Sequence, residues 1–394
     1  MSGGHYEHAG DDRSVAADVA RHRIAVNLLW CVPGEVGGSE EYLERQLSGL
    51  GRLATGFRPE VFAPTGYGAA HPAMAERFDV FTGGGDGRRR TRRIATEHTW
   101  LAWRTRDVDL VHHGGGTVPF VGNRPIVLTI HDLQFLRHPQ YHTTRKRRYL
   151  STVVPRSARR ADVIAVPSEF VRSTVIDAFG VDPHDVVVVR HGVGSDLGAE
   201  ATDAAILRER YSLGDGPVII YPAITHPHKG HRFLLDVLAL HWTDPDLRLV
   251  LLGGRGSADG IVEAAIDELG LRPRVVRPGR VRAADRDGLI ALSDALVFPS
   301  EYEGFGAPAL EAMALGTPVV CADHPALAEV VGSAGLVTPT SIDAWSGALD
   351  EVGRRRDQLV AAGTARAAHF TLERSGADLA LAYDRALEQT GTSR

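Results

Sequence analysis

Apolar positions along the chain follow two alternating periods. Short runs rich in β-branched residues, each bounded by Gly, Pro or Asp, are separated by stretches in which apolar residues return at helical spacing. This alternation predicts parallel βαβ units and an α/β fold. The predicted strands are Ile24–Val32, Glu60–Ala63, Val108–His112, Ile126–Ile130, Val163–Val166, Val186–Val189, Val218–Tyr221, Leu247–Leu252, Val275–Val276, Ala295–Phe298, Val319–Cys321 and Leu336–Val337.

The strands fall into two sets of similar size, which predicts two Rossmann-like, doubly wound domains facing each other across a cleft. Residues 192–202 between the sets read Gly-Val-Gly-Ser-Asp-Leu-Gly-Ala-Glu-Ala-Thr and have the composition of a linker. We therefore expect a flexible leader at 1–22, an N-terminal domain at 23–195, a C-terminal domain at 196–372 and a terminal helix at 373–394.

Composition narrows the class of protein. The 394 residues are 43% hydrophobic and 24% charged, with a net charge of -5, which is typical of a globular protein and disfavours a dedicated nucleic-acid binder. Cys31 and Cys321 are the only thiols, so we expect no disulfide framework and a reducing, cytoplasmic setting. The leader lacks the apolar core of a signal peptide, and no apolar run is long enough for a membrane span.

Candidate chemistry follows the strand Ala295–Phe298, because ligands of such sheets lie beyond the carboxyl ends of the strands. The sequence there is Glu303-Gly-Phe-Gly-Ala-Pro-Ala-Leu-Glu311, and Pro308 predicts the first turn of a helix. Gly304 and Gly306 allow close backbone approach, and the amides from Gly306 through Ala309 and Leu310 suit a diphosphate. The carboxylate of Glu311 suits the paired hydroxyls of a ribose, and Glu303 would face a sugar.

Glu303 and Glu311, with the residues between them, resemble the Glu-x7-Glu signature of retaining glycosyltransferases of family 4. The similarity continues through Ala312-Met-Ala-Leu-Gly-Thr-Pro-Val-Val320 and extends loosely over most of the chain. It implies the GT-B fold, with the nucleotide sugar on the C-terminal domain, the acceptor on the N-terminal domain and a terminal helix that packs back on the N-terminal domain. The alternative is a helix start with two solvated glutamates.

A second element, Tyr221-Pro-Ala-Ile-Thr-His-Pro-His-Lys229, follows the strand Val218–Tyr221. Lys229 is one of two lysines in the chain and resembles the phosphate-binding lysine of the family. Ile224 stands where many members carry an arginine, which leaves His226 or Arg255 to assist Lys229. Zinc is disfavoured because the neighbouring histidines lack an acidic ligand, and we expect no metal.

The N-terminal half contributes three further candidates. Gly37 and Gly38 resemble the first glycine loop of the family and would approach the donor. His131, in Thr129-Ile-His-Asp132, resembles the histidine that contacts the transferred sugar, and Asp132 beside it is a candidate for the acceptor side. His112 and His113 also follow a strand and are candidates for the acceptor side, although a core position is at least as consistent with the pattern. The expected donor-binding set is Gly37, Gly38, His226, Lys229, Arg255, Glu303, Gly304, Phe305, Gly306, Ala309, Leu310 and Glu311, with His131, Lys229 and Glu303 as the catalytic residues.

Two patterns of charged residues, a pair of Asp-x-Asp segments and an Arg-rich stretch, could each indicate a binding site. Asp107-Val-Asp109 and Asp244-Pro-Asp246 match a metal-binding pattern of other glycosyltransferases, but each precedes a predicted strand. Residues 80–160 contain 16 basic side chains against five acidic ones, and the stretch from Arg88 to Arg106 includes two tryptophans. This stretch is either a solvated basic helix or a site of peripheral contact with anionic lipid.

The resemblance predicts a retaining, metal-independent hexosyltransferase without a resident cofactor. GDP-mannose is the first expected donor, because the pattern around Lys229 is most like that of mannosyltransferases, and a UDP-sugar is the second. The acceptor would be a glycan, a lipid-linked group or a small molecule, and no nucleic acid is expected as a partner. The alternative is a GT-B scaffold that binds a nucleotide sugar without transferring it.

Overall fold

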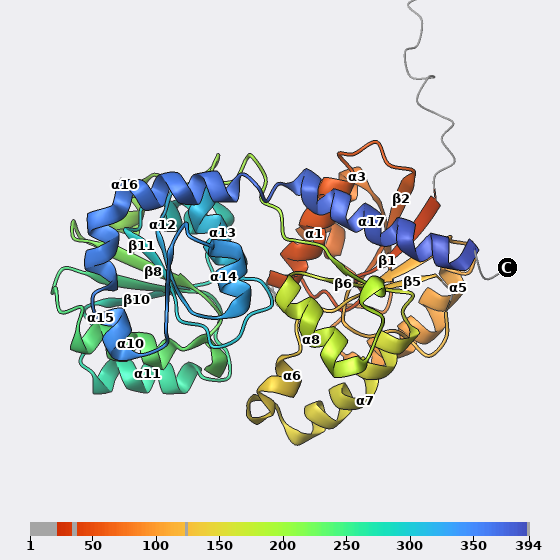
Figure 1. The fold of residues 1–394 in the computed structure, drawn as a ribbon, viewed down its shortest axis with the longest axis horizontal. Coiled ribbons are helices and arrows are strands. Elements are labelled where there is room, and N and C mark those ends of the chain that lie inside the picture. The colour runs from red at the N-terminus through yellow and green to blue at the C-terminus, as the bar shows by residue number, and fades with distance from the viewer. Residues whose placement is uncertain (1–21, 34–37, 123–124, 392–394) are drawn as a thin grey trace, which may run out of the picture.

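The computed structural model describes residues 22–33, 38–122 and 125–391; the predicted leader at 1–22 lies outside these ranges except for His22, which begins β1. Strands in the described ranges form two parallel sheets, one in each half of the chain (Figure 1). The N-terminal sheet has the order β3-β2-β1-β4-β5-β6-β7, and the C-terminal sheet has the order β10-β9-β8-β11-β12-β13. The strands are β1 His22–Asn27, β2 Phe57–Ala63, β3 Asp79–Thr82, β4 Leu110–His113, β5 Ile126–Thr129, β6 Val163–Val166, β7 Val186–Val188, β8 Val218–Pro222, β9 Arg248–Leu252, β10 Val275–Gly279, β11 Ala295–Phe298, β12 Val319–Ala322 and β13 Leu336–Thr338.

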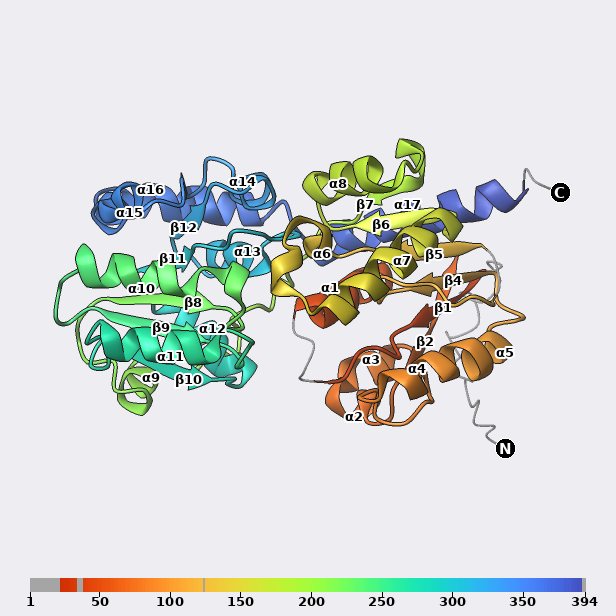
Figure 2. The ribbon, with the colours of Figure 1, turned by 90° about the horizontal axis from the view of Figure 1, so that it is seen from below.

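Helices cover both faces of each sheet, as the alternating pattern predicts, so that the molecule has two α/β lobes (Figure 2). In the N-terminal half they are α1 Gly38–Leu50, α2 Tyr67–Ala70, α3 Pro72–Arg77, α4 Arg90–Thr96, η1 Glu97–Leu101, α5 Ala102–Arg104, α6 Gln134–Arg137, η2 Pro139–Tyr141, α7 Thr144–Arg160, α8 Glu169–Phe179 and η3 Pro183–Asp185. In the C-terminal half they are α9 Ala204–Arg210, η4 Pro227–Lys229, α10 His231–Leu240, α11 Asp259–Glu268, α12 Ala283–Ala291, α13 Ala307–Ala314, α14 Pro325–Val331, α15 Ile342–Ser346, α16 Ala348–Ala367 and α17 Leu372–Gly391.

The topology fixes where a ligand can bind. In each sheet the strand order reverses beside its first strand, β1 in one lobe and β8 in the other. Loops after the two strands on either side of such a reversal run apart and leave a crevice at the carboxyl edge of the sheet. The loops after β1 and β4 therefore open a crevice in the N-terminal lobe, and those after β8 and β11 open one in the C-terminal lobe.

The chain crosses between the lobes twice, and the two crossings lie side by side. Val193 forms a parallel bridge with Thr371, and its amide donates to the carbonyl of Phe370. Helix α16 lies on the C-terminal lobe, whereas α17 runs across the N-terminal lobe beside α1 (Figure 1). Leu379, Ala382 and Tyr383 are spaced for one face of α17 and are buried in the N-terminal core.

One strand is absent from the prediction. The short edge strand β3 has two half-buried and two exposed residues, so it shows neither a buried run nor apolar alternation. The other strands lie where the pattern predicts them, with ends shifted in most cases; the largest shift is in β1, which ends at Asn27 rather than Val32. Residues beyond Asn27 form the turn that leads to the first crevice.

Candidate active site

The carboxyl ends of β8 and β11 bring two predicted catalytic residues together. Lys229 ends the short helix η4, Glu303 lies in the loop after β11, and Lys229 Nζ is 2.6 Å from Glu303 Oε1. The hydroxyl of Tyr221 donates to the carbonyl of Lys229 and lies 2.8 Å from Ser300 Oγ, which ties the two loops to each other. Both charged side chains keep part of their surface exposed, at 20% and 12%. The pair can therefore meet a ligand that enters from the cleft.

The start of α13 differs in detail from the expectation. Gly306 is the N-cap with φ 105°, a conformation that glycine adopts without a steric penalty, and Pro308 is in the first turn. The amides of Ala309 and Leu310 donate to the carbonyl of Gly306, and both residues are fully buried. Their predicted role as open phosphate donors is therefore wrong. Among the described residues, the backbone amides of residues 304–307 have no hydrogen-bond acceptor; Gly304 and Ala307 are half-buried, whereas Phe305 and Gly306 are buried.

Glu311 lies at the lobe interface and is held there by Arg45, which no motif in the sequence indicates. Its carboxylate is buried, and Arg45 Nη2 of α1 lies 2.5 Å from Oε1. Arg286 of α12 donates to Glu41 of α1 at 2.9 Å, so both of these ion pairs cross between the lobes. Burial lowers the pKa of Arg286, but the nearby charges of Glu311 and Glu41 outweigh it and raise the pKa overall. Both arginines remain charged.

His131 of the N-terminal lobe lies against the loop that follows β11. His131 Nε2 lies 2.8 Å from the carbonyl of Gly114, and the ring contacts Trp30 and the edge of Tyr42. Burial lowers the pKa of His131, so the ring is neutral with the proton on Nε2. A Cβ at Gly304 would lie 2.2 Å from the carbonyl oxygen of His131, so only glycine allows this approach of the lobes.

Two hydrogen bonds close the lobes around this point. Ser168 Oγ donates to the carbonyl of Gly304 at 2.6 Å, and the amide of Leu133 donates to the hydroxyl of Tyr302 at 3.2 Å. The acidic and basic groups at the ends of β5, β8 and β11 are therefore held in one interlobe site.

His191 belongs to the same site, although it was not a predicted site residue. It follows β7 and is stacked on Phe305 with a ring-centroid distance of 4.5 Å, and the centroid of the Tyr42 ring is 4.3 Å from that of His191. Burial lowers the pKa of His191 well below its usual value, and its buried Nδ1 has no partner among the described residues. The signal available in the sequence was a His-Gly pair that begins two residues after the end of a predicted strand.

His112 does not lie on the acceptor side. It is fully buried, with Nδ1 2.9 Å from the hydroxyl of Tyr383 and Nε2 2.7 Å from Thr129 Oγ1. His113 is also buried and lies 3.1 Å from Asn27 Nδ2. Burial lowers the pKa of each ring to about 3, so both are neutral. The two histidines support the core, and His112 links α17 to the sheet.

The other predicted donor-binding residues do not all lie near Lys229 and Glu303. Gly37 lies outside the described residues, and Gly38 is the exposed first residue of α1. His226 Nδ1 is 3.3 Å from Ser257 Oγ, and burial followed by the charge of Lys229 lowers the pKa of His226. Arg255 is 84% exposed and lies 3.7 Å from Asp259. The structure therefore places His226 near Lys229 and shows Arg255 directed toward Asp259.

The two charge patterns of the sequence also have clear positions. Asp109 caps the amide of Arg23, and the loops with Asp107 and Asp244 enter β4 and β9 rather than leave them. The Arg-rich stretch forms α4, η1 and α5 on the N-terminal lobe, where Trp103 is 57% exposed. In the described part of the chain, no helix has the length and hydropathy needed to cross a membrane.

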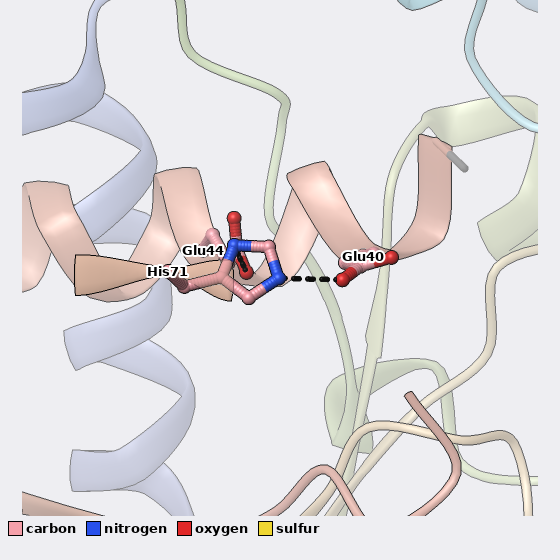
Figure 3. A group of neighbouring side chains, drawn as sticks. All are labelled: Glu40, Glu44 and His71. Atoms are coloured by element: carbon pink, nitrogen blue, oxygen red, sulfur yellow. Dashed lines mark hydrogen bonds and ion pairs between the residues drawn. The ribbon is translucent and has the colours of Figure 1, made fainter. Parts of the chain in front are cut away.

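A group with metal-ligand chemistry lies on α1, away from Lys229 and Glu303 in the sequence. Glu40 and Glu44 are one turn apart on this helix, and the ring of His71 lies between them (Figure 3). His71 Nε2 is 2.7 Å from Glu40 and Nδ1 is 2.8 Å from Glu44. Burial lowers the pKa of His71, but the two carboxylates outweigh it and raise the pKa to about 9. With both nitrogens protonated, the group is a satisfied ion-pair triad and offers no open nitrogen to a metal.

Two Rossmann-like sheets with acidic and basic groups at their facing edges have the architecture of the GT-B fold. The family described as Glycosyltransferase Family 4 matches residues 36–197, and Glycosyl transferases group 1 matches residues 204–365. The O-antigen chain mannosyltransferase B of Escherichia coli is 32% identical over 281 residues, which cover 69% of this chain and 74% of that protein. The chain therefore belongs to glycosyltransferase family 4 and is a glycosyltransferase.

Other similar proteins agree with this assignment. The MMP alpha-(1->4)-mannosyltransferase of Mycolicibacterium hassiacum is 29% identical over 73% of this chain and 73% of its own length. The crystal structure of Anabaena HepE with UDP and glucose covers 92% of this chain and 100% of its own, with a TM-score of 0.73 and 21% identity. At this identity the structural likeness shows the fold alone, which is the predicted GT-B fold.

Proposed function

We propose that the protein transfers a hexosyl group, mannosyl in the first instance, from a nucleoside diphosphate sugar to a hydroxyl group of an acceptor. The observation that carries the proposal is the pairing of Lys229 with Glu303 at 2.6 Å, opposite His131, where the lobes meet. A nucleotide sugar joins an anionic diphosphate to a neutral sugar. For the diphosphate, the site offers the ammonium group of Lys229 and the unpaired backbone amides of residues 304–307. For the sugar, it offers the carboxylate of Glu303 and the neutral imidazole of His131.

Each residue has a role that follows from its position. Lys229 stabilises the negative charge that develops on the leaving diphosphate, assisted by the amides of residues 304–307 and by His226. Glu303 accepts hydrogen bonds from hydroxyls of the sugar, and Glu311 keeps one carboxylate oxygen free of Arg45 for the ribose. Because Lys229 supplies the positive charge, we propose that transfer needs no metal ion, and a chelator should leave turnover unchanged.

The proposed stereochemical course of the transfer follows from the resemblance to retaining glycosyltransferases of family 4. Two carboxylates lie near His131 where the lobes meet: Glu303 is paired with Lys229, and Asp132 accepts the amide of Gln134. We propose that the acceptor attacks from the face that the diphosphate leaves, so that the anomeric configuration is retained. Closure of the lobes around Gly304 excludes water and limits hydrolysis of the donor.

The donor is proposed from the similar proteins and from the region around Lys229. The Escherichia coli and Mycolicibacterium relatives are both described as mannosyltransferases, which favours GDP-mannose. The HepE structure contains UDP and glucose, so a UDP-sugar is the second candidate. We further propose a glycan, lipid-linked or small-molecule acceptor.

Contact with a membrane surface is proposed for the Arg-rich stretch at the cytoplasmic face. Exposed Trp103 lies within reach of the guanidinium groups of Arg104 and Arg106, and exposed Phe120 lies beneath Arg156. Aromatic rings beside cations suit an anionic lipid surface. Flotation with vesicles that contain anionic lipid should retain the protein, and Trp103→Ser should reduce the retained fraction. Equal flotation with neutral vesicles would contradict this contact.

A panel of nucleotide sugars tests the proposed function against the scaffold alternative. We expect one nucleoside diphosphate to raise the melting temperature and the corresponding sugar nucleotide to be consumed, by transfer or by slow hydrolysis. Glu311→Ala should weaken binding of that nucleotide. Binding without turnover of any donor would support a scaffold, and the absence of binding would remove the site assignment.

A further inference from the structure

A separate cavity of about 280 Å³ lies within the N-terminal lobe, beside the proposed reaction centre. His131 and Asp132 line it after β5, and Gly115 and Gly116 line it after β4. Its volume is near the lower end of the range for small-molecule sites, roughly 300 Å³, which is enough for one sugar-sized group. Because His131 is shared with the donor side, a molecule in this cavity lies next to the sugar that is transferred.

Helix α7 supplies one wall of this cavity. Lys146, Leu150 and Val154 are spaced by one turn each and all line it. The wall is therefore apolar along most of its length and ends in an ammonium group. Lys146 Nζ has no carboxylate within ion-pair distance among the described residues, and its side chain is exposed.

The first turn of α7 carries an unusual charge pattern. Residues 145–148 are four consecutive cations, and the turn contains no acidic residue. Cations at the N-terminal end of a helix are electrostatically unfavourable, since that end already carries the positive end of the helix dipole. In the described part of the chain none of these four side chains is paired with a carboxylate. An anion bound at this end would offset the repulsion.

His142 adds a hydrogen-bonding group at the same end of the cavity. Its Nε2 is buried and has no partner among the described residues. Burial lowers the pKa of His142, and the charge of Lys146 lowers it further, so the ring is neutral. An unpaired buried nitrogen costs free energy that a bound ligand would recover. Asp132 also faces this end, but its Oδ1 already accepts the amide of Gln134.

We propose that this cavity binds the acceptor and that Lys146 and His142 recognise an anionic group on it, a phosphate monoester or diester. This inference rests on the proposed function. The acceptor hydroxyl lies toward His131, its body lies along Leu150 and Val154, and its phosphate lies at the start of α7. A phosphate of this kind can come from a soluble sugar phosphate or from the headgroup of a phospholipid.

Binding of matched ligands tests the proposal without requiring turnover. The probes are mannose and mannose 6-phosphate, inositol and inositol 1-phosphate, and glycerol and glycerol 3-phosphate, with calorimetry at low salt. Phosphatidylinositol in phosphatidylcholine vesicles, compared with phosphatidylcholine alone, tests the lipid source. We expect at least one phosphorylated member to bind at least about tenfold more tightly than its neutral partner.

Lys146→Gln should remove most of this preference. The matched control is Arg148→Gln, because it removes the same charge two residues further along α7, from the side away from the cavity. The control should change the preference by less than twofold. Equal effects of the two variants, or equal binding of neutral and phosphorylated members, would overturn the proposal. A loss in Lys146→Gln confined to the nucleoside diphosphate would also overturn it, since the lysine would then serve the donor.

The same measurements separate this proposal from the proposed function. If the wild-type protein consumes no sugar nucleotide but prefers a phosphorylated probe through Lys146, the transferase function fails and the anion site stands. If the donor is consumed and transferred but no probe shows a preference, the transferase function stands and the anion site fails.

Discussion

Histidine side chains in the N-terminal lobe exist in two charge states, and their partners decide which. His71 has a carboxylate at each ring nitrogen and is an imidazolium, whereas His112 has a hydroxyl group at each and is neutral. Burial opposes the charge in both cases, so the charged partners make the difference.

The raised pKa of His71 predicts a pH-dependent stability. The folded pKa is about 9 against an ordinary value of 6.5, so the stabilisation is fully present below about pH 6.5 and is lost as the pH rises toward 9. His71→Gln should lower the free energy of unfolding near pH 6 by about 3 kcal/mol more than near pH 9.5. Urea unfolding at both values measures this difference.

His241→Gln is the matched control, because His241 is exposed and has no ion pair among the described residues. Near pH 6 this variant should change the free energy of unfolding by less than about 0.5 kcal/mol. An equal cost of His71→Gln at both pH values would show that the triad is not charged as described.

Residue chemistry could be predicted best where one residue type is rare or fixed in a motif. Lys229 was identifiable because the chain has two lysines, and Glu303 because of its spacing from Glu311. Arg45 could not be identified in the same way, because the chain is rich in arginine and the partner of Arg45, Glu311, is 266 residues away in the sequence. His112 was ambiguous because a strand end in sequence can be a core position in the fold.

Helix α1 connects the elements of the site. One side carries Glu40 and Glu44, which bind His71, and the other carries Glu41 and Arg45, which reach the C-terminal lobe. The helix therefore holds the first crevice and the interlobe contact in one rigid body. Its N-terminal position after the glycine loop follows from the sequence, but its pairing with α12 and α13 depends on the arrangement of the lobes.

Arg45→Met tests the interlobe ion pair. It leaves the carboxylate of Glu311 buried without its cation, so the free energy of unfolding should fall by about 3 kcal/mol. Arg52→Met is the control, since Arg52 forms an exposed pair with Glu373 and should cost less than about 1 kcal/mol. Urea unfolding measures both, and similar costs would mean that the Arg45 pair is not buried.

The strands and helices themselves were largely predictable, because both lobes repeat one pattern. Strands in the middle of each sheet are uniformly buried and read as apolar runs, as in β6 and β11. The edge strand β3 lacks this signal because solvent faces half of it. The start of α13 was placed correctly by Gly306 and Pro308, while the use of its amides required the backbone geometry.

At the scale of the whole molecule, the two lobes meet where the proposed chemistry takes place. The loop after β11 contacts the end of β5 at Gly304, and the paired crossings at Val193 and Thr371 lie close to the same loop, since the rings of Phe305 and Phe370 are 6.0 Å apart. Motion about the crossings would open and close the contact at Gly304. The relative position of the lobes leaves no local pattern in the sequence, so it could not be predicted.

Gly304→Ala should prevent this closure. Its Cβ would lie 2.2 Å from the backbone of His131, which cannot move aside as a flexible side chain can. We expect kcat to fall at least about tenfold while the affinity for the nucleoside diphosphate changes little. Gly353→Ala in α16 has open space around the new methyl group and should leave kcat unchanged. Equal kcat values for both variants would show that turnover does not need the contact.

The most direct measurement is the turnover of Lys229→Ala with the sugar nucleotide that the wild-type protein consumes. Arg232→Ala is the control, since this nearby cation is exposed and paired with Asp236 and Glu268. We predict that kcat falls about 100-fold in Lys229→Ala, with a smaller change in donor affinity, and stays within twofold in the control. Wild-type turnover in Lys229→Ala would contradict a leaving diphosphate stabilised at the Lys229–Glu303 pair.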